Sequence, residues 1–231
     1  MEDKITAVGA GPPAAISMTM HATADTRVNF AVPHLISAAA LCRRVGDLEV
    51  ENQGREFGEF WHDILANATG VLFSAVAALE SYANELFVDH KEIFPELRLE
   101  VMAKLWELYE QKPILEKFEF ALLLKQKQAF DRGASPYQDV SVIIRLRNGL
   151  MHFKPEWFSA QEEHAKLSRC LNRRAVGSPF FPSSEPLFPR GWTSHATAKW
   201  IVRGVFQFIM DFEARTGMAR MSQFKDRFDA L

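Results

Sequence analysis

The chain has 231 residues, of which 48% are hydrophobic and 24% are charged, and its formal net charge is −2. Its 19 phenylalanines argue against a chain that is disordered throughout, because disordered chains carry too few apolar groups to form a core. The two cysteines are too few for a disulfide scaffold or for a cysteine-rich zinc or iron–sulfur site. The near-zero net charge neither favours nor excludes nucleic acid as a partner.

The first half of the chain predicts a leader and then helices. We expect residues 1–26 to be a flexible leader, since glycines and a Pro12-Pro13 pair prevent regular structure there. Apolar residues at helical spacing predict helices over 32–49 and 60–89, the longer one with a kink near Gly70. A third helix is predicted to open at Pro95, to break at Pro113 and to resume over 114–130.

The second half continues the helical pattern. We expect a helix from 135 or 136 to 153, a short polar helix over 159–173, and a Pro- and Phe-rich ordered loop over 175–192. A last main helix, capped by Thr193 or Ser194, should run to Arg215 and end at Gly217. No stretch alternates as a strand would. The sequence therefore predicts an all-α bundle of four to six helices in one domain over 27–216, with a C-terminal tail over 217–231.

Membrane and export signals are not evident. No apolar run reaches the roughly 18 to 20 residues that a membrane span needs. The acidic start at Glu2 and Asp3 is unlike a signal peptide, which needs a positive region. We therefore expect a cytoplasmic protein with no membrane partner.

The charge is unevenly distributed along the chain. Residues 46–100 contain twelve acidic and three basic residues, whereas residues 140–174 contain three acidic and seven basic ones. Two interpretations remain open: solvated helix faces of opposite sign, or a local basic surface for phosphate or polynucleotide.

The helix predicted over 136–153 contains the most informative stretch. Arg147 falls in the middle of its apolar face, and an arginine there is costly unless it is paired or opens onto a cleft. Arg145, Asn148 and His152 fall together on an adjacent strip. One interpretation is a structural ion pair between Arg147 and Glu80 of the long helix.

The stretch Arg147-Asn148-x3-His152 resembles the R-x4–6-H motif of HEPN domains, which often carry Asn after the Arg. The resemblance extends loosely over residues 30–215, including the long helix around Glu80 and Asn84. It implies a compact all-α domain. Many members are metal-independent endoribonucleases that act as toxins or as effectors of defence against phage.

The resemblance also implies roles for individual residues. Arg147 would bind the scissile phosphate, His152 would act as general acid or base in attack by the ribose 2′-hydroxyl, and Asn148 would position either group. Glu80 would orient Arg147 or tune His152, with Asn84 one turn along as a further supporting residue. RNA is the implied substrate, a homodimer the implied assembly, and an antitoxin or defence protein a further partner; no cofactor or metal is implied.

Several alternatives stay open. Arg145, six residues before His152, is a candidate second phosphate ligand or the motif arginine itself. Some members carry a Tyr that a partner nucleotidyltransferase modifies, and Lys154 stands there instead, which argues against that control and leaves Lys154 as a candidate substrate contact. Arg190, in the aromatic loop, is another. The other histidines, His164 among them, are expected at the surface or at helix caps. The family also includes inactive members, so the alternative function is a non-catalytic dimerisation or nucleotide-binding module.

Overall fold

The computed structural model describes residues 27–157, 160 and 162–229, so the leader predicted for 1–26 lies outside the described residues. The described part of the chain consists of helices and connecting loops and contains no strand. The all-α fold expected from the apolar periodicity is confirmed.

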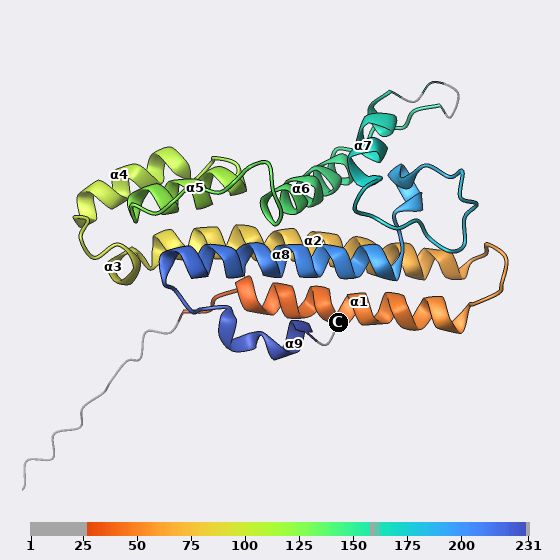
Figure 1. The fold of residues 1–231 in the computed structure, drawn as a ribbon, viewed down its shortest axis with the longest axis horizontal. Coiled ribbons are helices and arrows are strands. Elements are labelled where there is room, and N and C mark those ends of the chain that lie inside the picture. The colour runs from red at the N-terminus through yellow and green to blue at the C-terminus, as the bar shows by residue number, and fades with distance from the viewer. Residues whose placement is uncertain (1–26, 158–159, 161, 230–231) are drawn as a thin grey trace, which may run out of the picture.

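Three long helices form the base of the molecule: α1 (Ala31–Glu51), α2 (Phe60–Val88) and α8 (His195–Thr216). They lie side by side, with α2 and α8 between α1 and a second layer of helices (Figure 1). Their facing sides are fully buried; Cys42 of α1, for example, is 0% exposed. Burial raises the pKa of the Cys42 thiol to about 11, which fits the expected role of this residue as a small core side chain.

A second layer covers α2 and α8 (Figure 1). At one end lie α3 (His90–Ile93), α4 (Leu99–Tyr109) and α5 (Ile114–Leu124). At the other end lie α6 (Tyr137–Met151) and α7 (Glu163–Leu171), followed by a loop that contains the short element η2 (Leu187–Gly191). The loop is packed as expected, with Phe188 and Trp192 at most 2% exposed.

Three predicted helix boundaries are wrong. The helix expected to open at Pro95 begins at Leu99, because residues 94–97 form a turn in which Leu97 N donates to Phe94 O. The helix expected over 114–130 ends at Leu124, since Gln126 adopts a φ of 53°, which no helix can continue through. The polar helix expected over 159–173 is shorter and begins at Glu163.

By length and composition, α2 is able to cross a membrane, contrary to the sequence-based exclusion. Core helices of soluble proteins meet the same criteria, and in this fold α2 packs against both α1 and α8. The helix is unbroken at Gly70, where a kink was expected. Gly70 instead permits the close approach of α1, because a Cβ there would lie 2.8 Å from Leu41 Cδ1.

The last main helix has the predicted caps. Ser194 accepts from Thr197 N at the start, and Gly217 ends α8 with a φ of 73°. Beyond it, the segment predicted as a tail contains η3 (Ser222–Phe224) and α9 (Asp226–Asp229) and packs on the bundle through Phe228, which is 2% exposed.

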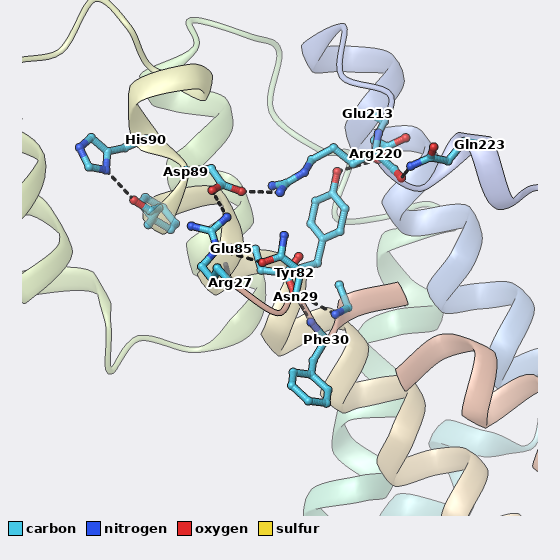
Figure 2. A network of polar contacts seen from close by, with 12 residues as sticks. Arg27, Asn29, Phe30, Tyr82, Glu85, Asp89, His90, Glu213, Arg220 and Gln223 are labelled. Atoms are coloured by element: carbon cyan, nitrogen blue, oxygen red, sulfur yellow. Dashed lines mark hydrogen bonds and ion pairs between the residues drawn. The ribbon is translucent and has the colours of Figure 1, made fainter. Parts of the chain in front are cut away.

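A buried polar network fixes this turn (Figure 2). Glu213, 1% exposed, accepts from Tyr82 Oη at 2.8 Å and from the backbone N of Arg220 at 2.9 Å and of Met221 at 2.6 Å. Nearby, Asp89 at the end of α2 pairs with both Arg27 and Arg220. These carboxylates are satisfied internally, so the network stabilises the fold and is not a site for a ligand.

Candidate active site

The helix that carries the motif ends at the proposed site. Met151 is the last residue of α6, and His152 follows as its C-cap, with its backbone N donating to Asn148 O at 2.9 Å. Pro155 prevents the helix from resuming. His152 is exposed, at the point where the chain leaves α6 and turns toward α7.

His152 lies on the wall of a cavity of about 440 Å³ between α6 and α7, called here the His152 cavity. Its volume is within the range of ligand-binding pockets. It is lined by Arg145, Gly149, His152, Lys154, Glu156, Glu163, His164, Lys166, Leu167, Cys170 and Phe188. Of the residues singled out in the sequence, the structure thus brings together His152, Arg145 and Lys154.

The two candidate arginines have different surroundings. Arg145 precedes His152 by two helical turns, so both lie on one side of α6 and face the His152 cavity. Arg147 is half-buried and does not line the cavity. Its Nε is buried and has no hydrogen-bond partner among the described residues. Of the two arginines, Arg145 is therefore the one that shares the cavity with His152.

The predicted ion pair between Arg147 and Glu80 does not form. Glu80 Oε1 instead accepts from Nζ of Lys117 at 2.6 Å, and Asn84 Oδ1 accepts from the same ammonium at 3.0 Å. The side chain of Lys117 is only 3% exposed, so its charge needs these partners. Glu80 and Asn84 therefore both bind Lys117 of α5, and neither lines the His152 cavity.

The other predicted contacts also lie outside the cavity. Asn148 is exposed and does not line the cavity, and its backbone oxygen accepts from the backbone N of His152. Arg190 pairs with Glu185 at 2.7 Å and stacks over the ring of Phe181, within its own loop. Met151 is the last residue of α6; helical spacing places it on the same side as Val140 and Ile143, yet it is 52% exposed.

The start of α7 fixes the loop that follows His152. The carboxylate of Glu156 accepts from the backbone N of Glu162 at 3.0 Å, of Glu163 at 3.2 Å and of His164 at 3.3 Å. Partial burial alone would raise the pKa of Glu156, but these donors hold it below its ordinary value. Glu156 thus caps α7 and joins it to the chain just after the motif.

His164 is the site residue that sequence reasoning missed. It was expected at the surface or at a cap, yet its side chain is 6% exposed and lines the His152 cavity. Its Nε2 lies 2.9 Å from Lys154 O, and its ring stacks on Phe153 with centroids 5.2 Å apart. The carbonyl needs a donor, so neutral His164 carries its proton on Nε2. His164 thereby positions the backbone of Lys154 beside His152.

Gly149 allows α6 and α7 to approach closely. A Cβ at this position would lie 2.6 Å from Leu167 Cδ2 and 3.5 Å from the ring of Phe188. A larger residue would push these side chains, which form the apolar floor of the cavity, away from α6.

The described residues contain no group of three or more His, Cys, Asp or Glu side chains arranged to hold a metal ion. In comparison with known proteins, no family model matches the chain, and no match is found among curated proteins or among solved structures. The residues of the His152 cavity and the motif are therefore the features that bear on function.

Proposed function

We propose that this protein is a HEPN-like, metal-independent endoribonuclease of the cytoplasm, whose active site is the His152 cavity. The observation that carries the proposal is the placement of exposed His152 at the end of α6, on the same cavity as Arg145 and Lys154. A histidine beside two cationic side chains is a combination suited to phosphodiester cleavage through the ribose 2′-hydroxyl.

The reaction requires one proton transfer and charge stabilisation. In the proposed step the 2′-oxygen forms a bond to phosphorus while the bond from phosphorus to the 5′-oxygen breaks. His152 takes the proton of the 2′-hydroxyl as general base, and the protonated imidazole can then return a proton to the 5′-oxygen as general acid. Arg145 and Lys154 would offset the negative charge that builds on the phosphate oxygens. The products are a 2′,3′-cyclic phosphate and a 5′-hydroxyl.

The biological role that accompanies the motif is that of a toxin or of an effector of defence against phage. A homodimer would bring two such cavities together, and an antitoxin or another defence protein would hold the activity in check. The apolar side chains next to the motif supply a surface for that assembly: Trp157 is 83% exposed, Met151 52% and Phe153 45%.

The same surface favours the second candidate function, a non-catalytic dimerisation or nucleotide-binding module. In that case the exposed apolar residues would be buried between two copies and His152 would be dispensable. The Arg147–Glu80 pair that first suggested such a structural role is absent, so the exposed apolar surface is now the observation that supports it.

Cleavage of mixed RNA in EDTA by the full-length protein separates the two. The endoribonuclease predicts cleavage without added metal, products that end in cyclic phosphate, and a loss of about 10²-fold or more in His152→Ala. His62→Ala removes an exposed histidine from α2 and is the matched control, expected to keep full activity. Intact RNA with the wild-type protein, or equal cleavage by His152→Ala, would refute the nuclease.

A further inference from the structure

A second cavity adjoins the active site. It has a volume of about 620 Å³, lies along α6 and α7, and is called here the arginine groove. Its lining comprises Arg132, Tyr137, Gln138, Ser141, Val142, Arg145, Arg169, Cys170, Asn172, Arg173 and Arg174. Five of these residues are arginines and none is acidic.

The arginines of the groove fall into two groups. Arg132 pairs with Glu119 at 2.6 Å and Arg174 with Asp139 at 2.9 Å, so their charges are balanced within the fold. The other three, Arg145, Arg169 and Arg173, are exposed and form no ion pair with the described residues. Three uncompensated guanidinium groups on one concave surface repel each other, and a bound polyanion would relieve that repulsion.

The groove continues into the His152 cavity. Arg145 and Cys170 line both, so a chain that lies in the groove passes directly to His152. Arginine is suited to such a path because its planar fork can bind two oxygens of one phosphate. Successive phosphates of one strand could therefore be held by Arg173, Arg169 and Arg145.

We propose that the arginine groove binds the backbone of single-stranded RNA and leads the strand to His152. The choice of RNA rests on the proposed function; the choice of a single strand rests on the groove. A concave surface with Tyr137 in its lining combines the backbone contacts and aromatic platform of single-strand binders. Every base has a face that can stack on an aromatic ring, and the arginines contact the backbone, so binding tolerates different sequences.

The test measures binding apart from cleavage. The full chain carrying His152→Ala, which cannot cut, is titrated onto a short fluorescein-labelled single-stranded RNA, and anisotropy is recorded between about 50 and 200 mM salt. In this background we compare Arg169→Ala/Arg173→Ala with Arg43→Ala. Arg43 is an exposed arginine of α1 that forms no ion pair with the described residues and lies outside the groove, which makes it the matched control.

The proposal predicts a Kd raised about tenfold in the double variant. It also predicts that the slope of log affinity against log salt concentration becomes shallower by about 1.4, or about 0.7 for each lost phosphate contact. Arg43→Ala should change neither. An unchanged slope in the double variant, or equally tight binding of the duplex of the same sequence, would overturn the groove as a single-strand site. Groove-dependent binding by a protein that never cleaves RNA would instead refute the nuclease and keep the groove.

Discussion

Glu80 and Lys117 offer an asymmetric test of the polar contact between α2 and α5. Lys117 is 3% exposed, whereas Glu80 is 39% exposed, so the two partners depend on each other to different degrees. Glu80→Gln keeps the size of the side chain and an amide oxygen that can still accept from Nζ of Lys117, but it removes the negative charge that balances the buried ammonium. Removing one member of a buried pair costs roughly 3–5 kcal/mol, and the hydrogen bonds that the new amide and Asn84 can still accept place our expectation near the lower end, at about 3 kcal/mol.

The opposite substitution should be milder. Lys117→Met replaces the buried ammonium with an apolar chain of similar length, and the part-exposed Glu80 can be hydrated. We expect a loss below about 1.5 kcal/mol. The double variant Glu80→Gln/Lys117→Met should therefore be more stable than Glu80→Gln alone.

Urea unfolding at pH 7, followed by circular dichroism, measures these free energies. Glu107→Gln is the control, since Glu107 pairs with Lys104 on the surface, where both side chains are about two-thirds exposed, and should change stability by less than about 0.5 kcal/mol. If Glu80→Gln were no worse than Glu107→Gln, the reasoning on the buried ammonium would be wrong. RNA cleavage, once established, should survive Glu80→Gln, because Glu80 does not line the His152 cavity.

Three further predictions concern the loops and cysteines around the site. Gly191→Ala should lower stability by roughly 2–3 kcal/mol, since its Cβ would lie 2.4 Å from the backbone oxygen of Pro186, whereas Gly177→Ala, whose Cβ would lie 3.8 Å from its nearest neighbour, should be mild. Thermal melts compare the two variants, and equal melting temperatures would contradict this prediction. The pKa of Glu156 is lowered in the folded state, so the stability that its cap contributes is complete above the ordinary pKa of 4.5 and is lost as the pH falls through the lower folded value. NMR chemical shifts of the amides that donate to Glu156 should titrate in this pH range, and in Glu156→Gln they should not. A thiol reagent should label Cys170 but not buried Cys42, and bound RNA should slow the labelling of Cys170. Labelling of Cys42 in the folded protein would count against the core packing.

Much of the fold follows from local sequence signals. The stripes of α1, α2 and α8 bury one side of each helix, and the two ends of α8 coincide with Ser194 and Gly217, whose capping preferences are strong. The end of α5 has no such signal, because Gln126 adopts a positive φ that a sequence would ordinarily reserve for Gly or Asn.

The site was less predictable because it depends on contacts between helices. Lys117 does carry a signal: it lies on the buried side of its helix with Ile114 and Ala121, so a partner carboxylate was needed. His164 has none, since its burial depends on the turn that returns α7 to the end of α6. The two-turn spacing of Arg145 and His152 is readable from helix geometry alone, and the cavity agrees with it.

Single-turnover cleavage of RNA in EDTA shows whether Arg145 and His152 act together in the His152 cavity. Arg145→Ala, Arg147→Ala and His152→Ala are compared at equal folded concentration, verified by their melts. We expect Arg145→Ala and His152→Ala each to lose about 10²-fold or more in rate, while Arg147→Ala stays within about tenfold of the wild type. A well-folded Arg147→Ala that is inactive, beside an active Arg145→Ala, would contradict it.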